Sequence, residues 1–556
     1  MFIRHRQLLI LSALVAVACN MHYPLMALYR QAFMTKCPEL TQGWNKGSFA
    51  VIGWDYPFLD EGMFAARTQT AARHRLPYDP YIKENRRPRL ICYDFLDFFV
   101  LGLIQRAVGN IQWTWALCRL VLAFFWFYLA YLLAERITRA PPVAIFFAVF
   151  VTFFGYLLYG NTTDILRWID LSTFKGVLHA CWDVLRWGRA EHVVRLTRPA
   201  ITFPAIFAVS LLTIKSVERR GGALLLAAGA ASGLLAYVHV DIWTTAVGCC
   251  ALLALMECWR RRRIVHELWL PLLSALAMSL PWAIYSLPLS PELVAAAEVS
   301  RRLDWISILY LAAFLEGCRR CASKENAPLL YLTAFEGSLF IMCNLQLVTG
   351  LKHETNHWHF FGNIYTFLFA LDCWEAAKKR VRPWNMLSLA AATAFLLQSM
   401  VYAAIRYPLY AYPKPIEEAA DWLNRNAPLD SVVATLDPST TLLIPMLTRC
   451  KVLAAYDNPF GASDLPRAEN AGRFRLALRL FGVSLDQAAH AKSRLGFFGP
   501  YTLPDAAAVE AVPGRIALDY FWLGPLEKDL IGGRRPAFAN TRPLFANAEV
   551  AIYRAP

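Results

Sequence analysis

The sequence lacks several signatures that would assign it to a functional class. It contains no P-loop, no GxGxxG fingerprint, no internal repeat and no low-complexity tract. The first two absences leave no glycine-rich motif for binding nucleotide phosphates, and the missing repeat disfavours transporters built from repeated halves. No small-residue cleavage site follows the apolar N-terminal run, so we expect that run to be a retained membrane span rather than a signal peptide.

Cysteine is present but forms no recognisable pattern. The 13 cysteines lie mostly within or beside apolar runs, and no disulfide framework is expected from them. Cys318-x-x-Cys321 has no partner pair, which makes it a weak signal for a metal or redox site. Cys37 and Cys92 fall on the same predicted side of the membrane and could form a disulfide, which the sequence leaves open.

Apolar residues dominate the composition. Of the 556 residues, 57% are hydrophobic and 14% are aromatic. Runs of about 17–23 residues match a helix that crosses a hydrocarbon core of about 30 Å. The predicted fold is an α-helical multi-span membrane protein with about eleven transmembrane helices, at 8–27, 112–134, 142–160, 200–214, 222–238, 241–257, 267–287, 303–318, 327–349, 359–377 and 384–406.

The segment 92–107 is apolar but short, and it carries two aspartates near its start. If it does not cross the membrane, every second loop is basic, which is the positive-inside pattern; these loops hold Arg4/Arg6, Arg136/Arg139, Lys215/Arg219/Arg220, Arg260–Arg263, Arg319/Arg320/Lys324 and Lys378/Lys379/Arg380/Arg382. If it crossed, the loop 135–141 would break the pattern. We therefore expect an interfacial helix at 92–107, a cytoplasmic N-terminus and an external C-terminus. Much of the net charge of +15 then sets orientation and does not indicate nucleic-acid binding.

The character of the sequence changes after residue 410. A Pro-marked linker is followed by an amphipathic helix and a β-branched strand near Ser431–Leu436, and later segments also alternate like strands. We therefore predict two parts, a transmembrane module at 1–410 and a small soluble α/β domain at 411–556 on the outer face.

The predicted outer loops differ from the basic inner loops. The two long ones, 28–111 and 161–199, mix carboxylates, imidazoles, amides and aromatic residues, and long loops of this kind are usually functional. Within them, DEGMFAARTQTAARHRL and DVLRWGRAEHVVRL read as amphipathic helices lying at the membrane surface. We expect the chemistry on this side.

The first outer loop contains adjacent carboxylates, Asp60 and Glu61, at the start of one predicted helix. Arg87-Pro88-Arg89 precedes an aromatic-rich segment further along the same loop. Together with the many spans and the outer C-terminal domain, these features resemble the C-type glycosyltransferase (GT-C) superfamily. Its members include aminoarabinose transferases of lipid A, protein mannosyltransferases and mycobacterial arabinosyltransferases. The aminoarabinose transferases carry Lys-Pro-Pro where this chain has Arg-Pro-Arg, so the resemblance implies the class and not the substrates.

The resemblance implies an inverting transfer of a sugar from a polyprenyl-phosphate donor to a cell-envelope acceptor. Asp60 would be the catalytic base that takes the acceptor proton, Glu61 its supporting neighbour, and Asp55 a secondary candidate. Cations must hold the phosphate as it leaves, and Arg89, Arg195 and Arg198 are candidates. The plainer alternatives are helix capping by the carboxylates and snorkelling by the arginines.

The segment GLKHETNHWHF precedes the tenth predicted span. Lys352, His357 and His359 are candidates for contact with the donor phosphate or the acceptor, and an interfacial polar turn is the plainer reading. His353 to His357 also matches the zinc-protease motif H-E-x-x-H, although the motif requires an exposed helix and a third ligand. His239 and Asp241 flank one residue in another outer turn. They are secondary candidates for contact with the acceptor, and a mutual hydrogen bond that closes the turn is the plainer explanation.

The sequence thus predicts an integral-membrane glycosyltransferase of a bacterial inner membrane. Its expected partners are a polyprenyl-phosphate-linked sugar, an envelope glycan, lipid or protein acceptor, and membrane lipids, with no nucleic acid. No cofactor is implied and no metal site is assigned, although a divalent metal is compatible with this function. Alternatives are a lipid or polysaccharide transporter or flippase, a membrane metalloprotease using His353-Glu354-x-x-His357, and a scaffold without activity.

Overall fold

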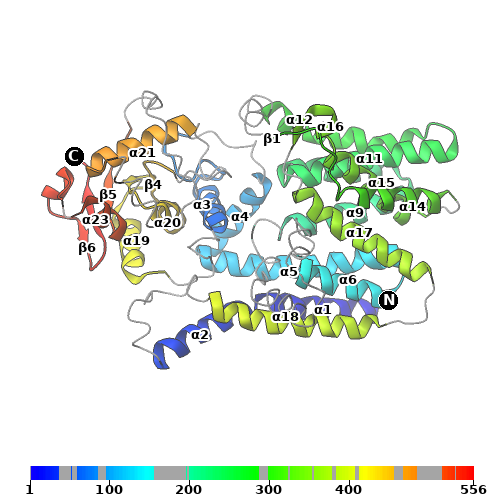
Figure 1. Cartoon of the computed structure of the whole chain (residues 1–556), viewed down its shortest axis with the longest axis horizontal. Coiled ribbons are helices and arrows are strands. Elements are labelled where there is room, and N and C mark those ends of the chain that lie inside the picture. The colour runs from blue at the N-terminus through cyan, green and yellow to red at the C-terminus, as the bar shows by residue number, and fades with distance from the viewer. Residues whose placement is uncertain are drawn as a thin grey trace. The chain divides into compact units, whose positions relative to one another are not determined.

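The protein is predominantly helical in the computed structural model (Figure 1). The structure describes residues 2–36, 52, 59–85, 95–155, 196, 200–286, 298–322, 326–352, 356–377, 383–406, 412–455, 467–484, 487, 516–532 and 534–556. The chain forms two compact units. The first unit comprises 1–25, 90–97 and 117–404, and the second comprises 26–89, 98–116 and 405–556.

Long apolar helices build the first unit. They are α1 (Phe2–Asn20), α5 (Ile111–Thr138), α6 (Pro141–Phe154), α9 (Thr202–Arg219), α10 (Gly222–Leu234), α11 (Val240–Arg261), α12 (Leu270–Ser286), α14 (Ile308–Cys321), α15 (Ala327–Cys343), α17 (Asn356–Ala376) and α18 (Trp384–Arg406). Shorter elements join them: η3 (Leu235–Tyr237), η4 (His266–Trp269), α16 (Gln346–Thr349) and the paired strands β1 (Glu298–Val299) and β2 (Leu351–Lys352).

Each of the eleven predicted spans overlaps a helix of the structure. Six described helical stretches are long and apolar enough to cross a membrane: His5–Ala32, Ile111–Thr138, Val240–Arg261, His266–Ile284, Ala327–Thr349 and Trp384–Ala404. Pro141–Phe154 and Gly222–Tyr237 are shorter apolar stretches. The chain is therefore a multi-pass membrane protein. The count of eleven and the orientation remain predictions.

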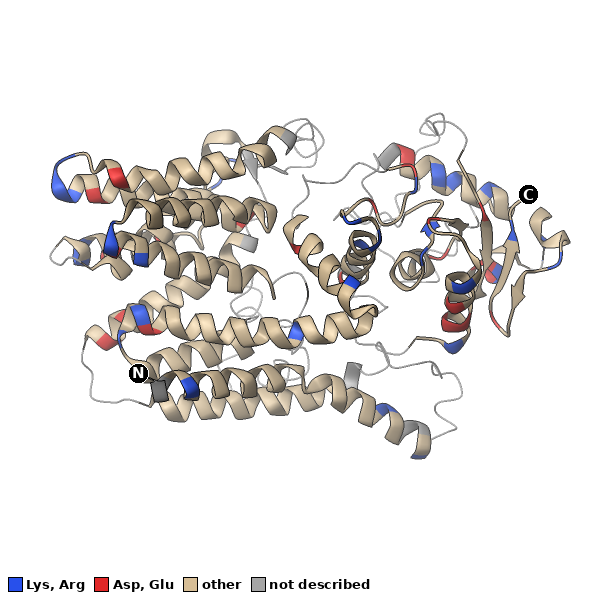
Figure 2. Ribbon diagram, turned by 180° about the vertical axis from the view of Figure 1, so that it is seen from behind, with Lys and Arg blue, Asp and Glu red and all other residues tan. Residues whose placement is uncertain are grey.

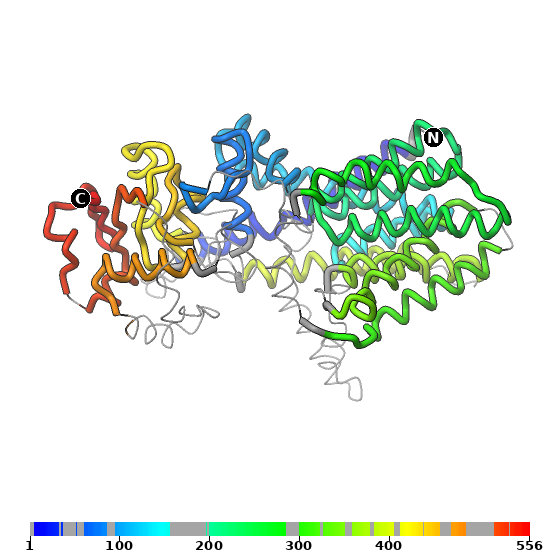
Figure 3. Tube along the Cα trace, turned by 90° about the horizontal axis from the view of Figure 1, so that it is seen from above, coloured from blue at the N-terminus to red at the C-terminus, as the bar shows by residue number. Residues whose placement is uncertain are grey.

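Small residues let the helices of the first unit approach closely. Helices α10 and α12 pack together, as do α14 and α15, and Figure 3 shows these green segments running alongside their neighbours. A Cβ added at Gly229 of α10 would lie 2.2 Å from the Pro271 carbonyl oxygen, and one added at Gly317 would lie 2.2 Å from the Thr333 hydroxyl. Lipid tails are as apolar as the helix side chains, so burial from lipid contributes little to helix association. Close approach of this kind stabilises membrane helices through van der Waals packing instead.

Basic residues gather at one end of the first unit, at the loops that join α9 to α10, α11 to α12 and α14 to α15 (Figure 2). Acidic residues partner some of them. The buried carboxylate of Glu257 accepts from Arg220 at 2.7 Å and Arg261 at 2.6 Å, and Arg320 pairs with Asp372 at 2.7 Å. All of these residues lie at helix ends that the charge pattern assigns to the cytoplasm.

The second unit combines helices with a five-stranded sheet in the order β4-β3-β5-β7-β6. Strands β3, β4 and β5 are parallel, whereas β7 is antiparallel to both β5 and β6. Its elements are α3 (Leu59–His74), α19 (Lys414–Asn426), β3 (Val432–Ala434), α20 (Pro438–Leu447), β4 (Lys451–Val452), α21 (Arg467–Phe481), β5 (Tyr520–Leu523), α23 (Pro525–Ile531), η8 (Ala537–Asn540), β6 (Phe545–Ala546) and β7 (Ala551–Arg554). Helices α2 (His22–Lys36), α4 (Phe95–Val108) and α18 each begin in the first unit and end in the second, whereas α5 begins in the second unit and ends in the first.

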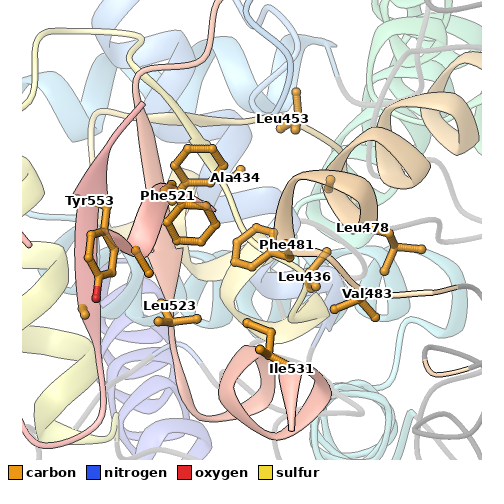
Figure 4. Close-up of a cluster of buried hydrophobic side chains, with 14 of the residues drawn as sticks. Ala434, Leu436, Leu453, Leu478, Phe481, Val483, Phe521, Leu523, Ile531 and Tyr553 are labelled. Carbon is orange, nitrogen blue, oxygen red and sulfur yellow. The ribbon is translucent and has the colours of Figure 1, made fainter. Parts of the chain in front are cut away.

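One hydrophobic core holds the sheet against its helices (Figure 4). Phe521 of β5 stacks on Phe538 at a centroid distance of 3.9 Å, and Phe481 of α21 contacts both rings. The predicted strand near Ser431–Leu436 is β3, and the later alternating segments contain β5 and β7. The predicted helix after the linker is α19. The domain boundary at residue 410 remains a prediction, and segments of the predicted first outer loop cluster with the C-terminal part in the second unit.

Candidate active site

Helix α3 carries the predicted acidic pair. It begins at Leu59, so Asp60 and Glu61 lie in its first turn, where carboxylates complement the positive end of the helix dipole. Asp60 is the second helical residue and not the cap before the helix. The side chain of Glu61 is 1% exposed, so its carboxylate is held inside the protein. The side chain of Asp60 lies outside the described residues.

Protein covers α3 on two sides. A Cβ added at Gly62 would lie 3.9 Å from the sulfur of Met446 in α20, and α3 and α20 pack along their length. On another side, a Cβ added at Gly102 of α4 would lie 2.7 Å from the Cβ of Ala71. The first-turn carboxylates therefore sit on a helix clamped by its neighbours.

The expectation that α3 lies with one face in the lipid headgroups stays a prediction. Its two arginines, Arg67 and Arg73, have partners inside the protein. The Arg67 guanidinium lies 5.7 Å from the ring centroid of Phe98, and Arg73 donates to the Thr448 carbonyl oxygen at 2.7 Å. Burial lowers the pKa of Arg73 to about 10, which leaves it charged at neutral pH.

Several predicted site residues lie outside the described residues, namely Asp55, Arg89, Arg195, Arg198, His353 and Glu354, as do the cysteines Cys37 and Cys92. The backbones of Lys352 and His357 are described, but their side chains are not. Lys352 pairs with Glu298 in the antiparallel β1–β2 ladder, and His357 lies in the first turn of α17. The predicted roles of all these residues remain proposals.

His359 is buried near the start of α17 and uses both ring nitrogens. Its Nε2 lies 2.9 Å from an Asp304 carboxylate oxygen, and its Nδ1 lies 3.0 Å from the Tyr310 hydroxyl. Tyr310 also donates to the Asn363 side-chain oxygen at 3.1 Å. Direct contact with a donor phosphate would require one of these bonds to break, so this geometry favours a positioning role for His359.

Asp304 was not among the sequence-based candidates. It precedes α14, and its backbone N–H donates to the side chain of Asn344 at 2.9 Å while its carboxylate accepts from the Ile306 N–H at 3.0 Å. The available signal was a carboxylate at the outer end of a predicted span, which is the kind of polar placement that marks function in a membrane protein.

His239 and Asp241 make the predicted contact. The Asp241 N–H donates to His239 Nδ1 at 3.2 Å, and the same nitrogen lies 3.4 Å from the Asp241 carboxylate. This pair begins α11, and the Trp358 indole of α17 donates to the Asp241 carbonyl oxygen at 3.2 Å. The starts of α11 and α17 are therefore tied together in the first unit.

Among the described residues no group of three His, Cys, Asp or Glu side chains could hold a metal ion. His353 and Glu354 of the zinc-protease motif lie outside the described residues, so the metalloprotease alternative stays untested.

Among the described residues, two groups of polar side chains bear on the proposed chemistry, one in each unit. In the second unit, the acidic first turn of α3 offers a carboxylate at a helix N-terminus. In the first unit, α11, α14 and α17 begin around Asp241, Asp304 and His359, at ends assigned to the outer side. A carboxylate can accept a proton, and a carboxylate–imidazole pair can fix a ring in one tautomer.

The chain is similar in structure to an oligosaccharyltransferase and to ArnT. The oligosaccharyltransferase is that of Archaeoglobus fulgidus, in a complex with Zn and sulfate, with a TM-score of 0.45 at 11% identity over 93% of this chain and 67% of that one. ArnT from Cupriavidus metallidurans bound to undecaprenyl phosphate gives 0.44 at 11% identity, over 89% and 93% of the two chains. The apo state of ArnT gives 0.45 at 10% identity, over 95% and 97%.

No family model matches the chain, and no curated protein matches it in sequence. Because the TM-scores are below 0.5, the structural similarity does not by itself assign a reaction to this chain.

Proposed function

We propose that this protein is a membrane glycosyltransferase of the GT-C type. It transfers a sugar, with inversion, from a polyprenyl-phosphate donor to a cell-envelope acceptor at the outer face of a bacterial inner membrane. The observation that carries the proposal is the acidic pair in the first turn of a clamped helix, α3, within the first outer loop.

In this mechanism Asp60 takes the proton of the acceptor hydroxyl as that oxygen attacks the anomeric carbon. The bond between that carbon and the phosphate oxygen breaks, and the lipid phosphate leaves with the electron pair. Glu61, in the same turn, supports Asp60 or orients the acceptor. Arg89, Arg195, Arg198, Lys352 and His357 are the candidates to stabilise the growing charge on the phosphate. His359, held by Asp304 and Tyr310, positions the start of α17.

The distribution of polar groups supports this proposal. Helix ends at one side of the first unit carry arginines (Figure 2). The starts of α11, α14 and α17 instead carry carboxylates, imidazoles and an indole. Lysine and arginine residues are enough to orient a chain in a membrane. The end of the first unit that carries carboxylates and imidazoles is the one equipped for acid–base chemistry.

Deleting the gene and analysing the lipid extract by mass spectrometry tests the function. We expect a polyprenyl-phosphate-linked sugar to accumulate and one envelope glycan or lipid to lose that sugar. Re-expression of the wild-type chain reverses both changes, and re-expression of Asp60→Asn reverses neither. An unchanged lipid extract and an unchanged envelope would overturn the proposal.

One observation favours the rival function of a transporter. Glu336 lies in the middle of the predicted span 327–349 and is fully buried. One of its oxygens accepts from Thr366 at 2.9 Å, and the other has no hydrogen-bond partner among the described residues. Carboxylates at this depth often serve transport. A transporter would lose function in Glu336→Gln and keep it in Asp60→Asn, whereas the transferase shows the opposite pattern.

A further inference from the structure

We propose that the C-terminal part of the chain positions the acidic turn of α3 through a fixed contact between α3 and α20, with Arg73, His74 and Asp430 as positioning residues. The inference deepens the proposed function and rests on it. It assigns to the C-terminal part a role in the reaction step and not only in folding. All of the contacts that carry it lie within the second unit.

The last turn of α3 is bonded to the C-cap of α20 and to the segment that leads into β3. Arg73 donates to the carbonyl oxygen of Thr448, the C-cap residue of α20, at 2.7 Å. The next residue, His74, places Nε2 3.2 Å from the carboxylate of Asp430, which precedes β3. The His74 and Asp430 side chains are 23% and 10% exposed, so water competes weakly for this pair.

A polar chain braces the middle of α3. Gln69 donates to the Met446 carbonyl oxygen of α20 at 3.4 Å, and its own oxygen accepts from Gln105 of α4 at 3.3 Å. Gln105 in turn accepts from the Thr114 hydroxyl at 2.6 Å. Side-chain amides thus link α4, α3 and α20 in one sequence of hydrogen bonds.

The chain that leaves α3 covers the edge strand β4. The Val452 N–H donates to the Tyr81 carbonyl oxygen at 2.8 Å, and Lys451, which is 5% exposed, donates to the Asp79 carbonyl oxygen at 2.6 Å. Asp79 folds this turn by accepting from the N–H groups of Tyr81 and Ile82. An edge strand whose backbone groups bond to a loop holds that loop in one register. The chain is therefore fixed beyond the last turn of α3 as well as along the helix.

Because α3 is a continuous helix, a displacement of its last turn also moves its first turn. An α-helix advances about 1.5 Å per residue, so a small tilt at Arg73 displaces the Asp60 carboxylate by a larger distance. A misplacement of about 1 Å at a reacting group can reduce turnover about 100-fold. Loosening the α3–α20 contact should therefore reduce the reaction rate at saturating donor more than it weakens donor binding.

The test uses two variants that remove contacts, together with matched controls. Arg73→Met removes the donor to Thr448 and keeps the length of the side chain. Asp430 has a φ of +60°, so Asp430→Gly removes the carboxylate without backbone strain, and Asp430→Asn keeps an acceptor for His74. Asn547→Ala is the stability control, because its side-chain nitrogen donates to Pro415 and Glu418 instead of to α3.

Two readouts are taken on the full-length protein. Hydrogen exchange follows the amides of α3 against those of α21. Initial rates, at limiting and saturating amounts, use the lipid-linked sugar purified from the deletion strain. In Arg73→Met and Asp430→Gly we expect exchange in α3 to quicken at least tenfold and kcat to fall about 10- to 100-fold, with KM within about threefold of the wild type. Asp430→Asn and Asn547→Ala should behave like the wild type in both readouts.

The inference is overturned if α3 exchanges normally in both loss variants, if exchange quickens while kcat is unchanged, or if Asn547→Ala lowers kcat as much as they do. Failure of the proposed function is a separate result: Asp60→Asn would then keep full activity. The exchange measurement does not depend on the reaction, so it distinguishes the two failures.

Discussion

Asp60 is the residue on which the proposed reaction depends most, because its carboxylate takes the proton. Replacing it with Asn preserves the size of the side chain and the polar first turn of α3, but removes the ability to take a proton. We expect turnover of the lipid-linked sugar to fall by roughly 10²–10⁴, the usual range for loss of a general base. The measurement is the initial rate in purified membranes, with the melting temperature confirming that the variant folds.

Near-full activity in Asp60→Asn would refute this role. Asp55 would then be the next candidate, since it precedes the pair in the same loop, and Asp55→Asn is the variant to compare. Glu61→Gln provides a second comparison: its side chain is buried, so we expect a loss of stability together with any loss of rate, unlike Asp60→Asn.

Asp437 gives a prediction about pH at the same scale. Burial and the neighbouring charge of Glu527 raise the pKa of Asp437 from 3.8 to about 6. A carboxyl group whose folded-state pKa is raised binds its proton more tightly in the folded state. Its contribution to stability is therefore complete below about pH 3.8 and is lost as the pH rises through about 6.

Asp437→Asn removes that titration while keeping a cap for α20, because the Asn oxygen can still accept from the Ser439 N–H. We expect the stability of the wild type, relative to this variant, to fall by ~2 kcal/mol between about pH 4 and pH 6 and to stay level above. Thermal unfolding of the full chain across this range measures it, and parallel curves would contradict the assignment.

Among the larger elements, the segment GLKHETNHWHF joins β2 to α17 and yields the next prediction. If it binds the donor phosphate, Lys352→Ala and His357→Ala should each raise the KM for the lipid donor about tenfold. Each variant removes a charge-assisted hydrogen bond to the phosphate. EDTA should leave the wild-type rate largely unchanged. His359→Ala should instead lower stability, because it breaks the bonds to Asp304 and Tyr310.

Zinc binding by the same segment would give different results. EDTA would then abolish activity, added zinc would restore it, and Glu354→Gln would be inactive while Lys352→Ala stayed nearly normal. If every variant kept the wild-type KM and EDTA had no effect, the segment would be an interfacial turn and would leave the proposed site.

For the whole molecule, the charge pattern predicts that 28–111 lies entirely outside and that α4 does not cross the membrane. Single cysteines at Val108, the last residue of α4, and at Arg139, just after α5, test this; both positions are exposed. We expect an impermeant thiol reagent to label Val108→Cys from the periplasm and Arg139→Cys only after the membrane is permeabilised.

Labelling of Arg139→Cys from outside, or protection of Val108→Cys, would contradict the eleven-span arrangement. The external positions of Asp60 and of the starts of α11, α14 and α17 would then have to be assigned again.

Sequence alone determined the elements whose signals are local. Hydrophobic runs the length of a bilayer placed the helices, strand alternation placed β3, β5 and β7, and the Asp60-Glu61 pair marked the start of α3. The His239–Asp241 contact was also predictable, because the two residues are separated by only one position. Each of these follows from neighbours along the chain, which is what periodicity and capping report.

Tertiary structure alone decided which distant segments meet. Acceptors from the C-terminal part, for example, bond to Arg73 and His74 at the end of α3, a pairing that no local pattern indicates. Likewise, Asp304 became a partner of His359 only when α14 and α17 packed together. The physical reason is that a buried charge or imidazole must find a partner, and the fold selects that partner from residues that can lie hundreds of positions away.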